Sequence, residues 1–377
     1  MPTRVVHLIN SLHALGGAER LVGTIAKLGS QRPLQVVTLW NASPSVASEL
    51  PAGTIETVSL LPFSIAALTK ARSMIARADV VHVHLSPAQF IGAFIRRPKL
   101  FTQHNSWNGR RALPCVQWLD RLLYGRYDRV VGVSDAVTRN VGLWASGDPD
   151  RYVTVSNGIE LGHFDAPPRA WTARLRDGTV RVGMAARFCA NKDHATLLRA
   201  LALLPPRFEL HFAGTGNLEA EARVRAGDLG VEERTRFHGA VTSMRDFYGM
   251  IDLYVQSSHH DGFSLVAAEA MASGVPLLAT DIPGLSDTIG SRDQCVAPRD
   301  APALATAIMA AVLDQRRYEA WAQRGKRQAL LFDASRMVTD YEALYACLAA
   351  DAPRSSTSPN VAAADPCDIF LDGPMPD

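Results

Sequence analysis

Short apolar runs alternate with longer segments of mixed polarity along most of the 377-residue chain. Runs rich in Val, Ile and Leu are typical of buried strands, and the longer segments repeat apolar residues at helical spacing. The runs predict strands at residues 4–10, 35–39, 79–85, 100–103, 129–134, 179–185, 208–213, 235–237, 253–255, 277–279 and 295–297. The longer segments predict helices at residues 20–28, 66–76, 137–144, 195–204, 265–273, 302–313, 318–330 and 336–348. Strands alternating with helices indicate an α/β fold built on parallel sheets.

The strands and helices fall into two series along the chain. A stretch containing Pro, Arg and Gly at residues 166–178 separates the two series. The length suffices for two domains. We therefore expect a first domain over residues 1–165, a second over 166–334 and a final helix over 335–350. Residues 351–377 are rich in Pro, Ser and Ala and carry one Arg against five Asp, so we expect a disordered tail.

The segment from Gln256 to Gly290 carries the most specific pattern in the chain. A loop follows the strand at 253–255 and enters a helix at 265–273 that is apolar on nearly every face, so the helix should be buried. The Ser264 hydroxyl is expected to cap that helix, and Gly274 to end it. A loop aimed at a helix N-terminus offers free N–H groups to an anion.

Glu269 is the one charged residue of that apolar helix. An ionised carboxylate in an apolar setting is costly unless it is paired or hydrogen-bonded. One interpretation is that Glu269 marks a solvent-exposed edge of the helix. The other is that it accepts hydrogen bonds from the hydroxyl groups of a ligand.

The pattern formed by Asp261-Gly262-Phe263, Glu269–Ala272 and Gly274–Pro276 resembles the donor-binding signature of family 4 glycosyltransferases. The family has Glu where this chain has Asp261, and its following Gly-x-x-Glu is Gly284 to Asp287 here. Extended over residues 4–350, the resemblance implies the GT-B fold. In that fold two Rossmann-like domains face each other across a cleft, and the final helix crosses back onto the first domain. It also implies a nucleotide-diphosphate sugar as donor, retention of configuration and no metal ion or other cofactor.

The resemblance assigns a role to each matching residue. Gly16 and Gly17 form the acceptor-side phosphate loop, and His104 contacts the donor sugar as a catalytic residue together with Asp261. The donor-binding residues that it implies are Arg187, Lys192, His238, Gly262, Phe263, Ser264, Leu265 and Glu269. Within that set, Arg187 and Lys192 bind the diphosphate, His238 lies beside the base and Glu269 holds the ribose. Two cations on one loop can clamp a diphosphate through charge-assisted hydrogen bonds, which stabilises the leaving group electrostatically.

Two further patterns leave alternatives open. His82 and His84 project from the same face of a predicted strand, which suits a metal pair, but the sequence shows no third ligand at suitable spacing and we expect no metal. Gly214-Thr215-Gly216 begins a dinucleotide fingerprint, but Glu219 stands at its third glycine, which disfavours a dehydrogenase.

Charge is unevenly distributed along the chain, whose net charge is +2. Residues 1–170 carry 18 Lys and Arg against 11 Asp and Glu, and residues 96–129 carry eight basic residues against two acidic ones. Trp107 and Trp118 lie among them, and basic residues with aromatic side chains suit an anionic membrane surface. The alternative is an amphipathic helix that packs on its own core. No nucleic-acid motif accompanies the patch, so nucleic acid is not an expected partner.

These observations together predict a glycosyltransferase that acts on a saccharide or lipid-linked acceptor in bacterial surface polysaccharide or glycolipid synthesis. The N-terminus has no signal-peptide pattern and no apolar run approaches a membrane span, so we expect a cytoplasmic protein, peripheral on the inner face of the plasma membrane. The alternatives are a nucleotide-sugar epimerase on the same fold and a catalytically silent subunit that binds sugar nucleotides.

Overall fold

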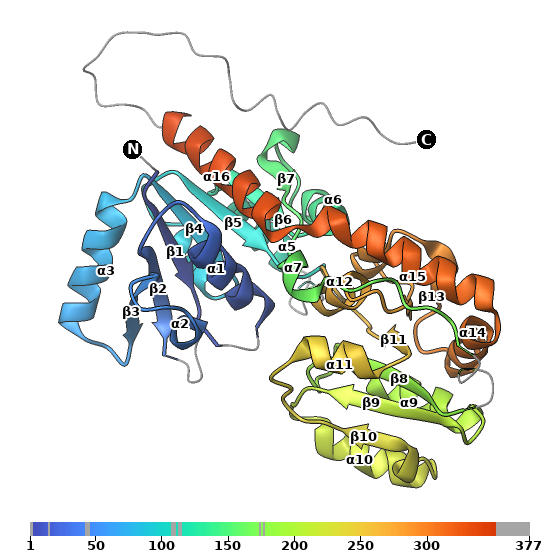
Figure 1. Cartoon of the computed structure of the whole chain (residues 1–377). Helices are drawn as coiled ribbons and strands as arrows, with labels where there is room; N and C mark the ends of the chain where they lie inside the picture. The colour runs from blue at the N-terminus through green and yellow to red at the C-terminus, as the bar shows by residue number, and fades with distance from the viewer. Residues whose placement is uncertain are drawn as a thin grey trace.

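The computed structural model describes residues 3–13, 16–41, 46–106, 111, 115–172, 175 and 178–351. Its elements form two parallel β-sheets, each covered by helices on both faces (Figure 1). Part of the basic–aromatic segment, including Trp107 and Arg110, lies outside the described residues, as do residues 352–377 of the predicted tail.

The first sheet has seven strands in the order β3-β2-β1-β4-β5-β6-β7, and all its pairings are parallel. The strands are β1 (Val5–Ile9), β2 (Leu34–Trp40), β3 (Ile55–Leu61), β4 (Val80–His84), β5 (Lys99–Gln103), β6 (Arg129–Gly132) and β7 (Tyr152–Thr154). The central strands β1 and β4 are buried along their whole length, as continuous apolar runs in a parallel sheet require.

The second sheet has six parallel strands in the order β10-β9-β8-β11-β12-β13. The strands are β8 (Val180–Ala185), β9 (Phe208–Ala213), β10 (Thr235–Phe237), β11 (Leu253–Gln256), β12 (Leu277–Thr280) and β13 (Cys295–Val296). The change from one sheet to the other falls between β7 and β8, which is where the sequence places the interdomain linker.

Helices connect the strands of both sheets. In the first half they are α1 (Gly17–Leu28), α2 (Val46–Glu49), α3 (Ile65–Arg77), α4 (Ala88–Gly92), α5 (Val116–Tyr124), α6 (Asp135–Ala145) and α7 (Leu161–Phe164). In the second half they are α9 (His194–Leu203), α10 (Glu219–Asp228), α11 (Met244–Met250), α12 (Leu265–Ala272), α13 (Leu285–Ile289), α14 (Ala301–Leu313), α15 (Gln315–Ala329) and α16 (Ala334–Asp351). No helix of the described residues is both long and apolar enough to cross a bilayer.

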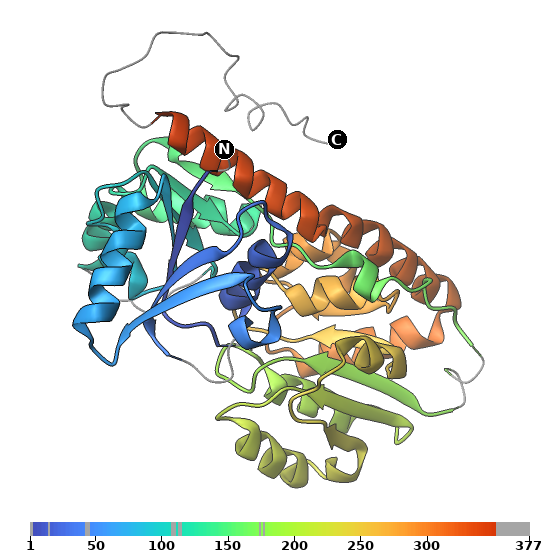
Figure 2. The same cartoon turned by 60° about the vertical axis from the view of Figure 1, so that its left-hand side comes forward.

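The last helix joins the two halves. After α15 packs on the second half, α16 runs back over the first sheet, as Figures 1 and 2 show from two sides. Met337, Tyr341 and Leu344 of α16 are buried in one cluster with Ile9 of β1 and Val22 of α1. The final helix therefore crosses back onto the first sheet, as the resemblance implies, and the fold is GT-B.

Candidate active site

An interdomain cavity with a volume of about 470 Å³ lies at the carboxyl ends of strands from both sheets. Ligands of open α/β sheets bind at this edge, where loops leave the strands. The first half contributes the loop after β1, His104 after β5, and Asn157. The second half contributes the loops after β8, β9 and β11, which carry Arg187, Lys192 and Asp261.

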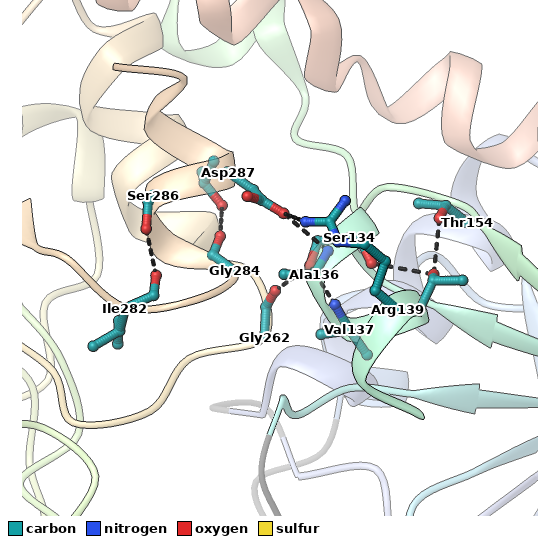
Figure 3. Close-up of polar contacts among 12 residues, drawn as sticks. Ser134, Ala136, Val137, Arg139, Thr154, Gly262, Ile282, Gly284, Ser286 and Asp287 are labelled. Carbon is teal, nitrogen blue, oxygen red and sulfur yellow. Dashed lines mark hydrogen bonds and ion pairs between the residues drawn. The ribbon is translucent and has the colours of Figure 1, made fainter. Parts of the chain in front are cut away.

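The loop after β11 is held from the first half of the chain (Figure 3). Ser134 Oγ donates to the carbonyl of Gly262 at 2.7 Å, and Ser106 Oγ donates to the carbonyl of Asp261 at 2.8 Å. Asp287 Oδ2 accepts from the amide of Ala136 at 2.9 Å, in the first turn of α6. A carboxylate is favourable at a helix N-terminus, so Asp287 joins α13 of the second half to α6 of the first.

Two glycines allow this close approach of loops. A Cβ on Gly262 would lie 2.1 Å from the carbonyl oxygen of His104, and one on Gly284 would lie 2.4 Å from that of Gly262. Gly284 also has a φ of +82°, which disfavours other residues. Gly262 thus brings the loop after β11 against the end of β5, where His104 lies.

The cations of the cavity lie beside carboxylates. Lys192 Nζ is 2.5 Å from Asp261 Oδ2, and these side chains are 19% and 13% exposed. Arg187 lies near the buried Glu19, whose pKa is raised by burial, while the charge of Arg187 acts in the opposite direction. The two cations expected on the diphosphate therefore both line the cavity, and Lys192 already pairs with the carboxylate expected on the sugar.

Ser264 precedes α12 as its N-cap residue, but the expectation that its hydroxyl caps the helix is wrong. The hydroxyl makes no capping bond and has no hydrogen-bond partner in the described structure, although the residue is only 2% exposed. Ser264 lines the cavity together with Phe263 and Leu265. Because buried polar groups are normally hydrogen-bonded, the Ser264 hydroxyl is available to a ligand that enters the cavity.

His104 lines the same cavity with Gly16 and Gly17. Its Nε2 lies 3.3 Å from His84 Nδ1, and burial lowers the pKa of His104 to about 3. The ring is therefore neutral at physiological pH and acts as a hydrogen-bonding group, not as a cation.

Glu269 is neither at a solvent-exposed edge nor in the same cavity as Arg187. It is 4% exposed, and it lines a neighbouring interdomain cavity of about 430 Å³. Arg20 Nη1 donates to Glu269 Oε1 at 3.2 Å, and the Tyr248 hydroxyl donates to Oε2 at 2.9 Å. Burial raises the pKa of Glu269, against the charge of Arg20 and the bond from Tyr248. The exposed-edge interpretation is therefore wrong, and the carboxylate has protein partners.

Two other expected site residues lie apart from the cavity lining. His238 turns its Nε2 to His211 Nδ1 at 3.0 Å and packs its ring against Phe247. Gly262 contributes close packing, as described above, and is not among the lining residues. Ala240 and Val241, which follow His238, line the cavity in its place.

Three contributors escaped sequence reasoning: Glu19, Arg20 and Tyr248. Arg20 and Glu269 are 249 positions apart, so their contact depends on how the halves meet. The available signal for Glu19 and Arg20 was their position directly after Gly16-Gly17, in the first turn of α1.

The histidines of β4 have a neighbour that the sequence did not reveal. His7 of β1 brings one nitrogen within 4.8 Å of nitrogens of His82 and His84, a neighbour in space that the spacing in the sequence did not show. However, His82 already bonds the Tyr345 hydroxyl and Thr102 Oγ1 through its two nitrogens, at 2.7 Å each. A metal ion bound to His82 would have to displace one of these two hydrogen bonds.

Comparisons with known families agree on both halves of the chain. The family described as Glycosyltransferase Family 4 matches residues 15–163, and the family described as Glycosyl transferases group 1 matches residues 171–328. A phosphatidyl-myo-inositol mannosyltransferase of Mycolicibacterium smegmatis is 27% identical over 85% of this chain and 87% of its own. A lipopolysaccharide core mannosyltransferase of Rhizobium meliloti, LpsB, is 33% identical over 33% of this chain and 38% of its own.

Solved structures share the whole architecture. HepE of Anabaena, solved with UDP and glucose, superposes with a TM-score of 0.78 at 20% identity, covering 91% of this chain and 99% of its own. Sucrose-phosphate synthase of Thermosynechococcus elongatus gives a TM-score of 0.73 at 21% identity, covering 92% and 99%. At these identities the likeness establishes the GT-B fold.

Proposed function

The chain is a glycosyltransferase of the family 4 type, and we propose that it transfers a sugar from a nucleotide-diphosphate donor to a lipid-linked saccharide, with retention of configuration. The observation that carries this proposal is the cavity of about 470 Å³ in which Arg187 and Lys192 face His104 and Gly17. That cavity combines two cations, uncapped amides of α12 and a neutral imidazole at the meeting point of two sheets.

The donor diphosphate would lie between Arg187, Lys192 and the N-terminus of α12. Charge-assisted hydrogen bonds to phosphate are short and about twice as strong as neutral ones. The nucleoside would extend toward Thr215, Val241 and Met244 of the second half, which line the cavity on that side. HepE of Anabaena was solved with UDP and with UDP-glucose, which supports a uridine nucleotide as the first to test.

The chemistry asked of the protein is stabilisation of a leaving nucleoside diphosphate. As the bond between the sugar and the phosphate breaks, negative charge grows on the phosphate oxygen, and Arg187 and Lys192 would face it. These two side chains supply the positive charge that a metal ion would otherwise provide. We therefore propose transfer without a metal or other cofactor. The family resemblance is what supports retention in this proposal.

The loop after β11 and His104 would bind the sugar. Asp261 is one methylene shorter than the family's Glu, and Lys192 holds its carboxylate at 2.5 Å. A hydroxyl group of the sugar would therefore meet an ion pair, with Asp261 accepting its hydrogen bond. The neutral His104 would contact the same sugar from the first half.

A lipid-linked acceptor is supported by an exposed basic–aromatic surface on the first half of the chain. We define this surface by Ile91, Phe94, Trp118, Leu119 and Leu122, with Arg121 and Arg126 among them. Trp118 is 71% and Phe94 is 69% exposed, and the Arg126 guanidinium lies 5.5 Å from the Phe94 ring centroid. An exposed aromatic with arginines around it suits the interface of an anionic bilayer.

The rival interpretation, packing within the domain, applies to part of the segment. Arg111 donates to Asn140 Oδ1 at 2.6 Å and lies over the Trp144 ring at 5.2 Å. We therefore assign the membrane contact to the basic–aromatic surface and not to Arg111. The proposed location is the cytoplasmic face of a bacterial plasma membrane, and the named relatives that act on phosphatidyl-myo-inositol and lipopolysaccharide core support an acceptor of this class.

The test is a panel of UDP-, GDP- and ADP-sugars, first by thermal shift and then by product analysis with lipid-linked acceptors. We expect one nucleotide class to raise the melting temperature, since a ligand of the native state stabilises it by mass action. We also expect release of a nucleoside diphosphate together with a glycosylated acceptor. If the donor is converted into an epimer without any acceptor, the protein is an epimerase. If the donor binds but is not turned over, the protein is a catalytically silent subunit.

A further inference from the structure

A chain of three imidazole rings leads from the interior of the first sheet to the cavity. His7 lies in β1, His84 ends β4 and His104 directly follows β5, and these strands are neighbours in the sheet. His7 Nδ1 lies 3.1 Å from His84 Nε2, and His84 Nδ1 lies 3.3 Å from His104 Nε2. The two inner rings are fully buried, and His104 lines the cavity.

All three rings are neutral. Burial lowers the pKa of His7 and of His104 to about 3, and it lowers the pKa of His84 well below its ordinary value. A neutral imidazole carries one proton, so one of its nitrogens donates and the other accepts. Both contacts of the chain therefore need a donor on one side and an acceptor on the other.

This requirement leaves two arrangements for the whole chain. Either all three rings carry the proton on Nδ1, or all three carry it on Nε2. Any mixture sets two donors or two acceptors against each other at one of the two contacts. In the first arrangement His104 presents an Nδ1–H donor, and in the second it presents a bare Nδ1 acceptor.

We propose that His84 and His7 are positioning residues for His104: the two contacts tie the tautomer of His104 to those of the buried rings, and so set which hydrogen-bonding character His104 Nδ1 presents to the donor sugar. Within the described structure, Nδ1 of His104 makes no hydrogen bond. This inference rests on the proposed function in that it takes the ligand of His104 to be the sugar.

The inner end of the chain supports a functional reason for the arrangement. His7 Nε2 is buried and has no hydrogen-bond partner among the described residues. A buried nitrogen without a partner is costly in a native protein and calls for an explanation. His82 provides the contrast: it is equally buried on β4, but its bonds to Tyr345 and Thr102 do not lead to the cavity.

The direct test is nitrogen NMR of the protein labelled with ¹⁵N-histidine, without any donor. A protonated ring nitrogen and a bare one give separate signals, so each ring reports its own tautomer. Substitution of single histidines assigns the signals. We expect His7, His84 and His104 to carry the proton on the same nitrogen. A different protonated nitrogen on His84 and His104 would overturn the inference.

Two substitutions at His84 separate its two contacts. An Asn amide reaches the position of Nδ1 and can still meet His104, whereas a Gln amide reaches the position of Nε2 and can meet only His7. We expect His84→Gln to release His104 into a mixture of tautomers and to lower kcat by about tenfold, the value of one hydrogen bond, with KM for the donor unchanged. His84→Asn should restore most of that kcat.

His82→Gln is the matched control, because it removes an equally buried imidazole of the same strand. We expect its melting temperature to fall as much as that of His84→Gln while the tautomer of His104 stays single. Unchanged His104 signals in His84→Gln would refute the positioning role. If the three rings share a tautomer but the protein binds no sugar nucleotide, the proposed function is refuted, while the coupling of the three imidazoles stands.

Discussion

The ion pair between Lys192 and Asp261 predicts that these two neighbours respond to substitution in opposite directions. Their charged atoms lie 2.5 Å apart in a cavity where both side chains are largely buried. In the free protein, Asp261 therefore pairs with the lysine that we propose for the diphosphate. Removing either partner should affect nucleotide binding and sugar transfer differently.

In Lys192→Met the diphosphate loses a cation and meets the uncompensated carboxylate of Asp261. A hydrogen bond to a charged group is worth about 1.5–3 kcal/mol, so kcat/KM should fall by roughly 10- to 150-fold. The affinity for the bare nucleoside diphosphate should fall by a comparable factor. In Asp261→Asn the lysine is released, so nucleoside diphosphate should bind at least as tightly as in the wild type, while sugar transfer slows.

The double variant Lys192→Met/Asp261→Asn completes a thermodynamic cycle. Because it removes both charges, we expect it to bind nucleoside diphosphate more tightly than Lys192→Met alone. Contacting residues typically show coupling energies of about 0.5–3 kcal/mol. Calorimetry with the nucleoside diphosphate and steady-state kinetics with the sugar nucleotide give the two readouts. Wild-type nucleotide affinity in Lys192→Met, or additive effects in the double variant, would refute the reasoning.

Three further outcomes are expected. Asp287→Asn removes the negative charge at the N-terminus of α6, and with it the ion pair to Arg139. It should lower the free energy of unfolding by about 0.3–1 kcal/mol in urea denaturation, and an unchanged value would remove Asp287 as a stabilising interdomain contact. Because burial lowers the folded-state pKa of His7 and His104 to about 3, the unfolded state binds more protons below pH 6.5. The free energy of unfolding should therefore decrease as the pH is lowered from 6.5 to 3, by up to about 1.4 kcal/mol per pH unit for each histidine. This dependence on pH should be shallower in His7→Gln. Trp118→Ser should reduce co-sedimentation with anionic vesicles at low salt, while Val224→Ser, at a similarly exposed residue of the second half, should not. Equal binding of both variants would count against the membrane surface.

The sequence predicted the buried central strands of both sheets, and it also predicted the partly buried edge strands β10 and β13. The runs of β1, β4 and β8 are continuous because both of their faces are covered by helices. The edge strand β3 was missed, since most of its residues are only partly buried and its sequence has no continuous apolar run. Helix α10 was missed because its surface is largely polar; pairs such as Arg223 with Glu219 support it instead of an apolar stripe.

The cavity was predictable only as far as local motifs reach. Arg187, Lys192 and Asp261 follow strand ends, and the parallel sheets bring those ends together. The ion pair between Arg20 and Glu269 joins α1 to α12, and the bond from Ser134 to Gly262 joins the first half to the loop after β11. These contacts depend on how the two halves meet, which no short-range pattern encodes. The chain of His7, His84 and His104 likewise depends on strand order.

The central claim, that the cavity holds the diphosphate of a sugar nucleotide, is tested most directly by calorimetric titration with UDP, GDP and ADP. The titrations compare the wild-type protein with an Arg187→Ala/Lys192→Ala double variant whose melting temperature shows that it is folded. We predict saturable binding of one of these nucleotides to the wild-type protein and a loss of at least roughly 100-fold in affinity in the variant, since two charge-assisted contacts are removed. No binding of any of the three nucleotides to the wild-type protein, or equal binding to the variant, would contradict the claim.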